Sequence, residues 1–404
     1  MKVAIIGAGA AGCFCAVNLK RMLPEAEITV FERASKPMAK LAVTGGGRCN
    51  LTNTFQEITH LSQAYPRGGR LMERLFHEFS PEDTCRWWEQ EGVPLVTQLD
   101  QCIFPRSQRA MQVVDTLLRL MQEGGVRLCT NCRIVSITPD RRILGTAPTD
   151  DTPFDAIVIT TGGSPRPSGL DFLSPLHLRR EPPVPSLFAL NIEDAALHEL
   201  TGIVIDRCSV SIAGTKFQAE GALLITHFGM SGPAILRLSS YAARHLAEQN
   251  YRITLSVNWM QGQNEEQVQQ ILQGFQHTDR QVANLHPSYL TARHWAMLLH
   301  RANISENHRW DALNRKEMNR LTAVLTADNY TVTGRRTHKA EFVTCGGVSL
   351  QEVNPRTLGL KNHPGIFLAG EVLDIDAITG GFNLQAAWTT AYVVAHSIYQ
   401  KFIL

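Results

Sequence analysis

A glycine pattern near the N-terminus constrains the fold of this chain more than any other feature. Gly7, Gly9 and Gly12 form G-x-G-x-x-G between an apolar stretch at residues 2–6 and a helical pattern, and an acid, Glu32, follows about 20 residues later. In a β-α-β unit the first glycine allows a tight turn, the second admits a pyrophosphate and the third lets helix and strand pack closely. The pattern therefore predicts a parallel sheet whose first turn binds a dinucleotide.

The rest of the chain predicts an α/β protein whose sheet domain is discontinuous. Apolar strands are expected at 2–6, 27–32, 126–137 and 154–160, and GIFLAGE at 365–371 resumes that style near the C-terminus. The proline-rich PPVPSLF, from residue 182, is expected to be a linker, and it precedes short alternating stretches and then a glutamine-rich helical region. We expect a nucleotide-binding domain over 1–185 and 343–404, a β-rich insert over 186–260 and about 331–342, and a helical insert over 261–330.

Composition excludes several classes of protein. The 404 residues are 44% apolar and 19% charged, as in ordinary globular proteins, and the net charge of +2 gives no global attraction to nucleic acid. The N-terminal apolar stretch resembles a signal peptide, but its glycines fit the nucleotide turn better. No apolar run is long enough to predict a membrane span. Nine cysteines show no disulfide framework, which favours a reducing cytoplasm.

The C-terminal motifs favour FAD over NAD. GIFLAGEVLD ends a buried strand in Gly370 and Glu371, and many flavoproteins have an acid at this place that binds the ribityl chain. GGFNLQAAW, residues 380–388, then begins a helix whose N-terminal amides can face the N1 and O2 edge of a flavin. Such amides stabilise the negative charge that a reduced flavin carries.

The loop TGGGRCN, residues 44–50, is expected to lie against the flavin. Three glycines let the backbone approach a phosphate or a flat ring without clashes of Cβ atoms. Arg48 can bind a phosphate or a carbonyl group, and Asn50 can donate and accept. Cys49 lacks the second cysteine that disulfide reductases place five positions later, because Thr54 stands there. Cys49 is either a proton donor or a small buried side chain.

With these motifs in view, the chain resembles the BaiN/RdsA-like family of NAD(P)/FAD-dependent oxidoreductases over nearly its whole length. The resemblance implies an FAD-binding Rossmann-like domain with a β-barrel-like insert and a helical insert, and reduction of conjugated C=C bonds. Two departures stand out: a proline-rich segment replaces a glycine-rich one after Gly163, and Met38-Ala39 replaces a glycine and a basic residue. The shared motifs are GAGAAG (7–12), KP (36–37), TGGGRCNLTN (44–53), FPRSQRAMQVVDTL (104–117), TTGG (160–163), THFGMSGPAIL (226–236), TCGGV (344–348) and GEVLDIDAITGGFNLQAAW (370–388).

The function expected is reduction of a conjugated C=C bond in a small molecule by hydride transfer from flavin N5. One alternative is a flavoenzyme that reduces uridine to dihydrouridine in rRNA, and another is a flavin-binding protein without turnover. No second G-x-G-x-x-G is present, so NADH or NADPH would act as a transient electron donor. A small-molecule acceptor is favoured over rRNA, no membrane partner is expected, and the oligomeric state stays open.

Candidate site residues follow from the motifs and the resemblance. Candidate catalytic side chains are His227, Cys49 and Arg48, and Ser231 with Pro233 is expected to start a helix. Arg335, Arg336 and Lys339 could hold RNA phosphate, although a solvated turn is favoured. Cys129 and Cys132 form C-x-x-C on an expected strand, but no second pair of ligands accompanies them, so no metal site is expected. The cofactor-binding candidates are Gly7, Gly9, Ala10, Ala11, Gly12, Glu32, Arg33, Lys40, Gly45, Gly46, Gly47, Arg48, Cys49, Asn50, Val135, Thr161, Gly162, Gly163, Gly370, Glu371, Gly380, Gly381, Asn383 and Leu384.

Overall fold

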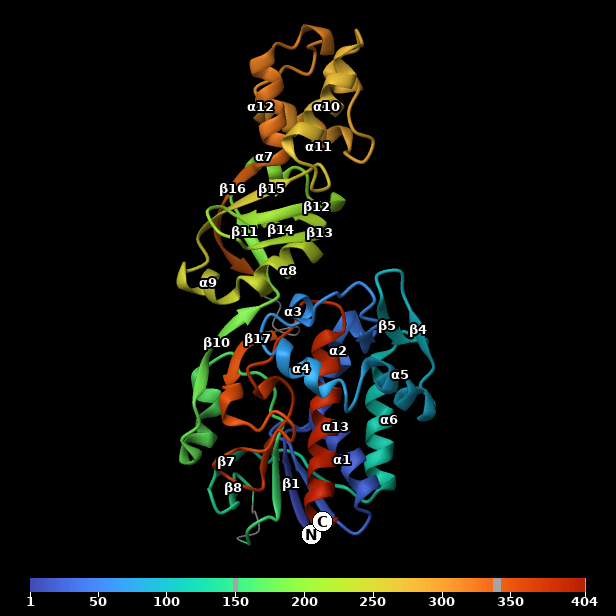
Figure 1. Ribbon diagram of the computed structural model, residues 1–404, viewed down its shortest axis with the longest axis vertical. Helices are drawn as coiled ribbons and strands as arrows, with labels where there is room; N and C mark the ends of the chain where they lie inside the picture. Colours follow the sequence, from blue (N-terminus) through green and yellow to red (C-terminus); the bar gives the residue numbers. More distant parts are fainter. Residues whose placement is uncertain (148–151, 337–342, 404) are drawn as a thin grey trace. The chain divides into compact units, whose positions relative to one another are not determined.

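The chain folds into two compact units (Figure 1). The computed structural model describes residues 1–147, 152–336 and 343–403. The first unit comprises Met1–Pro185 with Lys339–Leu404, and the second comprises Ser186–His338. Lys339, a candidate for binding phosphate, lies outside the described residues.

A parallel sheet forms the centre of the first unit. The five strands run in the order β18-β9-β1-β2-β6, and every neighbouring pair is parallel. Residues Val3–Ile6 and all of β9 are buried, as expected for a parallel sheet with both faces covered. Helices α1 and α13 lie side by side against it (Figure 1). The bounds are β18 Ile366–Leu368, β9 Ala156–Ile159, β1 Lys2–Ile6, β2 Glu27–Phe31, β6 Arg127–Cys129, α1 Ala10–Met22 and α13 Phe382–Ile403.

Smaller elements surround this sheet. Ser80 caps α5 by accepting from Asp83 N, with Pro81 in the first turn. The bounds are α2 Ala39–Gly47, α3 Leu61–Ala64, α4 Gly69–Leu75, α5 Pro81–Gln90, α6 Ala110–Glu123, the antiparallel β3 Thr52–Asn53, β5 Cys102–Pro105 and β4 Leu95–Thr97, the pair β7 Ile134–Ile137 and β8 Ile143–Gly145, the pair β10 Arg180–Ser186 and β17 Val343–Val348, and the 3-10 helices η1 Pro167–Leu176, η4 Leu350–Glu352 and η5 Gly370–Val372.

Two expectations about the first unit were wrong. The proline-rich segment expected as a linker is strand β10, which pairs with β17 in a two-stranded sheet. Proline is tolerated there because a strand with a single neighbour leaves one row of N–H groups unpaired. The single strand expected over 126–137 is split into β6 and β7, and Cys132 lies in the connection.

A closed barrel forms the centre of the second unit. The strand order is β11-β14-β13-β12-β15-β16, with antiparallel neighbours. Inward-facing residues alternate along β12, where Cys208, Val210 and Ile212 are buried. The Rossmann-like fold with a barrel insert and a helical insert is confirmed. The bounds are β11 Ala189–Ile192, β14 Gly229–Ser231, β13 Gln218–Thr226, β12 Val204–Ile212, β15 Ile253–Asn258 and β16 Asp328–Arg336.

Helices occupy the chain between β15 and β16. Asn264, Thr291 and Asn314 cap the three α-helices by accepting from backbone N–H groups of the first turn. Within the described ranges no helix is long and apolar enough to cross a membrane. The bounds are α10 Glu265–Gln276, η2 Val282–Asn284, α11 Ala292–Arg301, η3 Trp310–Ala312 and α12 Arg315–Thr326, and the unit also holds α7 Ala195–His198, α8 Pro233–Tyr241 and α9 Ala243–Glu248.

Ser231 is not the N-cap of α8, contrary to the sequence prediction. Ser231 ends β14, and the N-cap is Gly232, with φ of +94° and Pro233 following it. A Cβ atom on residue 232 would lie 2.9 Å from Ala222 O, so glycine is required by both space and backbone conformation.

Candidate cofactor site and family

The three glycines of the N-terminal fingerprint have different structural reasons. Gly7 has φ of +107°, and a Cβ atom there would lie 2.6 Å from Thr160 O. A Cβ atom on Gly12 would lie 2.0 Å from Gly7 O. Gly9 has no protein atom within 4 Å of such a position. Packing therefore explains Gly7 and Gly12, whereas the open side of Gly9 fits a close approach by a ligand.

The N-terminus of α1 is suited to an anion. Its N-cap is Gly9, which supplies no side-chain hydrogen bond, and its first turn holds no acid. The amides of Ala10, Ala11 and Gly12 have no intrahelical acceptor, and the helix dipole places positive potential there. These amides and the helix dipole can bind a pyrophosphate without a positively charged side chain.

Glu32 is fixed beside this turn by two backbone donors. Ala8 N donates to Glu32 Oε2 at 2.9 Å and Ala34 N donates to Glu32 Oε1 at 2.8 Å. Each carboxylate oxygen keeps a second acceptor site, which suits ribose hydroxyls. The neighbouring Arg33 is exposed.

The Glu371 carboxylate contacts Thr344, Lys40 and the turn at Gly163. Thr344 N donates to Glu371 Oε1 at 2.9 Å, and Lys40 Nζ lies 3.4 Å from Glu371 Oε2. A Cβ atom on Gly163 would meet Glu371 Oε1 at 2.6 Å, so this carboxylate lies directly against the glycine turn. A Cβ atom on Gly370 would lie 3.0 Å from Ala11 Cβ, which brings this segment to the start of α1.

The loop at residues 44–50 has the unusual backbone that its glycines allow. After Thr44, Gly45, Gly46 and Gly47 have φ of +57°, +67° and +81°. These left-handed values favour glycine. No protein atom lies within 4 Å of a Cβ position on Gly46 or Gly47. The outer part of the loop therefore presents bare backbone with room beside it.

This loop contacts the start of α13 directly. With its amide oriented to satisfy both neighbours, Asn50 donates to Thr52 O at 3.1 Å and accepts from Gly381 N at 3.2 Å. Asn53 Nδ2 donates to Gly380 O at 3.1 Å. These contacts bring the N-terminal loop against the start of the C-terminal helix.

Gly380 and Gly381 introduce α13 with φ of +130° and +90°. Asn383 closes the preceding turn, accepting from Ala377 N and donating to Ala377 O, each at 3.0 Å. The helix begins at Phe382, so its first amides, including that of Leu384, have no intrahelical acceptor. They form a second site for negative charge.

The two candidate catalytic side chains of the loop differ in exposure. Arg48 is exposed; its Nε donates to Gly45 O at 3.1 Å, and its guanidinium lies 4.7 Å from the centre of the Phe104 ring. Cys49 is fully buried, and burial raises the pKa of its thiol to about 12, against a small lowering by Thr44. A thiol in this environment is a weak proton donor, so its burial supports packing over acid catalysis.

Three candidates belong to other segments of the chain. His227 belongs to the second unit, where it is exposed in the turn between β13 and β14, with its ring 5.0 Å from that of Phe228. Its catalytic role stays a prediction. Val135 is 42% exposed in β7, and Thr161 is exposed after β9.

Three polar residues of the site were not predicted. Thr160 Oγ1 donates to Gly7 O at 2.8 Å and so holds the fingerprint turn, and Asn53 holds Gly380. Thr344 Oγ1 is buried without a hydrogen-bond partner among the described residues, next to Gly163. Thr160 could have been found from its place at the end of a strand that neighbours β1.

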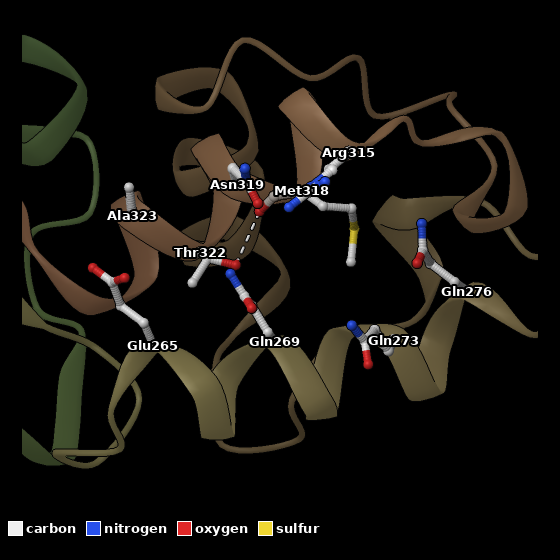
Figure 2. Close-up of a pocket in the computed structure, with 9 residues that line it drawn as sticks. All are labelled: Glu265, Gln269, Gln273, Gln276, Arg315, Met318, Asn319, Thr322 and Ala323. Atoms are coloured by element: carbon white, nitrogen blue, oxygen red, sulfur yellow. Dashed lines mark hydrogen bonds between the residues drawn. The ribbon is translucent and has the colours of Figure 1, made fainter.

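Two hollows accompany these elements. A cavity of about 230 Å³ adjoins Glu371 and Gly162 in the first unit, and the segment from Ser164 to Asp171, where the chain departs from the family pattern, forms one wall. A groove of about 660 Å³ lies between α10 and α12 in the second unit, and Figure 2 shows the polar side chains that line it. The groove contains none of the candidate residues; its lining is Glu265, Gln269, Gln273, Gln276, Arg315, Met318, Asn319, Thr322 and Ala323.

Residues 1–397 match the family described as the HI0933-like protein Rossmann domain. The chain belongs to this family. It is 27% identical to the ribosomal RNA dihydrouridine synthase of Escherichia coli K12, over 98% of this chain and 97% of that protein. It is 24% identical to the 3-dehydro-bile acid delta(4,6)-reductase of Clostridium scindens, over 99% of both chains.

A solved structure supports the fold. The 3-ketosteroid-delta4-(5alpha)-dehydrogenase of Rhodococcus jostii RHA1 has a TM-score of 0.50 at 13% identity, over 97% of this chain and 96% of that one. The predicted family and the predicted oxidoreductase class are confirmed: the chain is a flavin-dependent oxidoreductase.

Proposed function

We propose that this protein reduces a C=C bond conjugated with a carbonyl group of a small molecule, using FAD bound along the first unit. The observation that carries the proposal is a set of three contacts, which join Gly370 to Ala11 at the start of α1, Glu371 to Lys40, and Asn50 to Gly381. When bound, FAD supplies the hydride from its N5 atom to the β-carbon of the acceptor.

In this proposal the residues of the chain bind FAD and orient it. The first amides of α1 and the Glu32 carboxylate hold the pyrophosphate and the ribose. Glu371 binds the ribityl chain, and Lys40 Nζ, 3.4 Å from Glu371 Oε2, holds the carboxylate in place. The free amides at the start of α13 stabilise negative charge at the far edge of the ring.

Arg48 is the candidate for polarising the acceptor carbonyl, because it is exposed beside the glycine loop and is always charged. The α-carbon also requires a proton, and the donor predicted from the sequence is His227. NADH or NADPH binds transiently as electron donor, since the sequence contains a single nucleotide fingerprint.

The names of two relatives support reduction of a conjugated C=C bond. A delta(4,6)-reductase of a 3-dehydro-bile acid and a dihydrouridine synthase both act on a double bond conjugated with a carbonyl group. A uridine in rRNA is therefore the second candidate acceptor. The pair Arg335 and Arg336 at the end of β16 favours it, since arginines that rest on aromatic rings can contact phosphates.

Anaerobic reduction tests the proposal. The purified protein should show a flavin spectrum that NADH or NADPH bleaches, and a steroid-type enone should restore the oxidised spectrum. Restoration by a uridine-containing rRNA fragment and not by the enone would select the second candidate. A protein that takes up no FAD would refute both.

The position of the ring is tested by a matched pair of glycines. Gly47 and Gly92 both have φ of +81° and no protein atom within 4 Å of a Cβ position. Substitution by alanine should therefore destabilise the FAD-free protein equally, by about 1–2 kcal/mol. Only Gly47→Ala should weaken FAD binding, by about tenfold or more. Equal FAD affinities of the two variants would place the ring elsewhere.

A further inference from the structure

We propose that Cys129 and Cys132 form an oxidisable dithiol, which a hydroperoxide closes to a disulfide, and that this closure weakens FAD binding at Glu32. The second half of this proposal rests on the proposed FAD site. The first half depends only on the structure around the two thiols.

Both cysteines are held by the same residue. Glu32 N donates to Cys129 O and Cys132 N donates to Glu32 O, each at 2.8 Å. In a regular parallel ladder the two partners of one residue lie two positions apart. Here they lie three apart, so one extra residue is accommodated at the end of β6, as in a β-bulge.

Asn131 provides the backbone turn that accommodates this residue. Its φ of +54° is left-handed, a conformation that asparagine tolerates, and its N–H donates to Ala34 O at 3.1 Å. In a regular parallel ladder, the residues that bind the N–H and the C=O of one partner are two positions apart and about 6.6 Å from each other, close to the upper limit for a disulfide. Cys129 and Cys132 bind Glu32 in this way although they are three positions apart in the sequence. From this shared partner we infer that the two thiols lie near bonding range.

The electrostatics of the pair indicate the same proximity. Burial raises the pKa of the Cys129 thiol, the Arg127 charge lowers it and the neighbouring Cys132 raises it again. Both thiols are free in the structure, Cys129 half-buried and Cys132 buried at 3% exposure. An oxidant thus reaches Cys129 first, and Cys132 is placed to resolve the product.

The chemistry requires one hydroperoxide. The Cys129 sulfur attacks the terminal peroxide oxygen, so that an S–O bond forms, the O–O bond breaks and an alcohol, or water from hydrogen peroxide, leaves. The Cys132 sulfur then displaces water from the sulfenic acid, forming the S–S bond as the S–O bond breaks. The proton of the Cys129 thiol passes to the leaving alkoxide or hydroxide, and the proton of the Cys132 thiol leaves in the water formed from the sulfenic acid. The two thiols thereby lose two electrons in total, and these two electrons reduce the peroxide.

Closure acts on the cofactor site through Glu32. The thiol form satisfies both backbone bonds of Glu32 and both bonds of its carboxylate. Drawing the two sulfurs to the bond length of about 2.05 Å tightens the bulge and displaces Cys132 N, and the Glu32 backbone follows it. The carboxylate that is expected to hold the ribose then loses its position.

Peptide mapping tests the first half. FAD-free and FAD-loaded protein are treated with hydrogen peroxide near pH 8.5, alkylated and digested. A crosslinked Cys129–Cys132 peptide, two hydrogens lighter than the dithiol form, is expected in wild type and in the half-buried control Cys85→Ser. Cys132→Ser should instead accumulate a sulfenic acid on Cys129 that dimedone traps. Absence of the crosslink from wild type in both preparations would overturn the proposal.

Flavin release tests the second half. The dissociation constant of FAD should rise about threefold or more on oxidation, return on reduction with dithiothreitol, and stay constant in Cys129→Ser. Equal affinities of the oxidised and reduced protein would overturn this half. A chain that binds no FAD in either state would refute the proposed function, while the mapping would still decide the disulfide.

Discussion

Gly9→Ala separates a requirement of the cofactor from a requirement of the fold. A Cβ atom on residue 9 meets no protein atom within 4 Å, and its φ of −86° is accessible to alanine. The free energy of unfolding of the FAD-free protein should fall by no more than about 1 kcal/mol, the cost of alanine at an N-cap. The dissociation constant of FAD should rise about tenfold or more, because the methyl group occupies space that a pyrophosphate needs. Urea unfolding and flavin fluorescence measure the two quantities.

Two other glycines serve as controls for that experiment. Gly7→Ala puts a Cβ atom 2.6 Å from Thr160 O at φ of +107°, so it should destabilise the FAD-free protein by about 2–4 kcal/mol. Gly274→Ala, in α10 with no atom within 4 Å, should leave FAD affinity unchanged and stabilise its helix by up to about 1 kcal/mol. The reasoning is refuted if Gly9→Ala binds FAD like wild type, or unfolds as easily as Gly7→Ala.

Two further predictions concern the interior of the first unit. Asp376 is fully buried and pairs with Arg67, whose Nε donates to Asp376 Oδ1 at 2.6 Å, so Asp376→Asn should cost about 3–5 kcal/mol in urea unfolding. Asp311→Asn, in an exposed pair, is the control and should have no measurable effect, and equal losses would contradict the assignment. Burial raises the pKa of Cys49 to about 12, so this thiol contributes stability that is complete below the pKa of an unfolded cysteine and is lost as pH rises toward 12. Cys49→Ala should therefore reduce the alkaline loss of stability, by up to about 1.4 kcal/mol per pH unit, and an unchanged slope between pH 9 and 11 would count against a buried thiol.

Strands and turns that depend on local chemistry could be predicted from the sequence. Residues 2–6 form β1 as expected, because a short apolar run directly before G-x-G-x-x-G is typical of the first strand of a β-α-β unit. Ser80 and Pro81 start α5, and a sequence can indicate such a start because their hydrogen bonding and fixed φ act within one helical turn. The glycines at 45–47 were expected to let the backbone approach a ligand, and the structure adds that all three are left-handed.

Features that depend on distant neighbours could not be predicted. The prolines of β10 are compatible with a strand only because β17 pairs on one side, and that partner lies far along the chain. Gly232 takes the cap of α8 because Ala222 O lies close by, which no pattern around Ser231 reveals. The bulge that places Cys129 and Cys132 around Glu32 likewise needs the register of β2 and β6.

The contacts between the N-terminal loop and the start of α13 explain why the motifs could indicate candidate cofactor residues but not their geometry. Asn50 accepts from the backbone of Gly381, Asn53 donates to the backbone of Gly380, and Thr160 donates to the backbone of Gly7. A backbone atom is offered by every residue type, so no complementary pair of side chains is visible in the sequence. Close contacts with the backbone also require glycine at positions where a side chain would block the approach, and these glycines are visible in the sequence. A Cβ atom on Gly381 would lie 2.4 Å from Thr52 O, and this closeness requires glycine at the helix start whether or not a flavin is bound. Glycines with close protein neighbours, such as Gly381, are therefore explained by the fold, whereas Gly9 and Gly47 have open space beside them and are the positions where we expect the ligand.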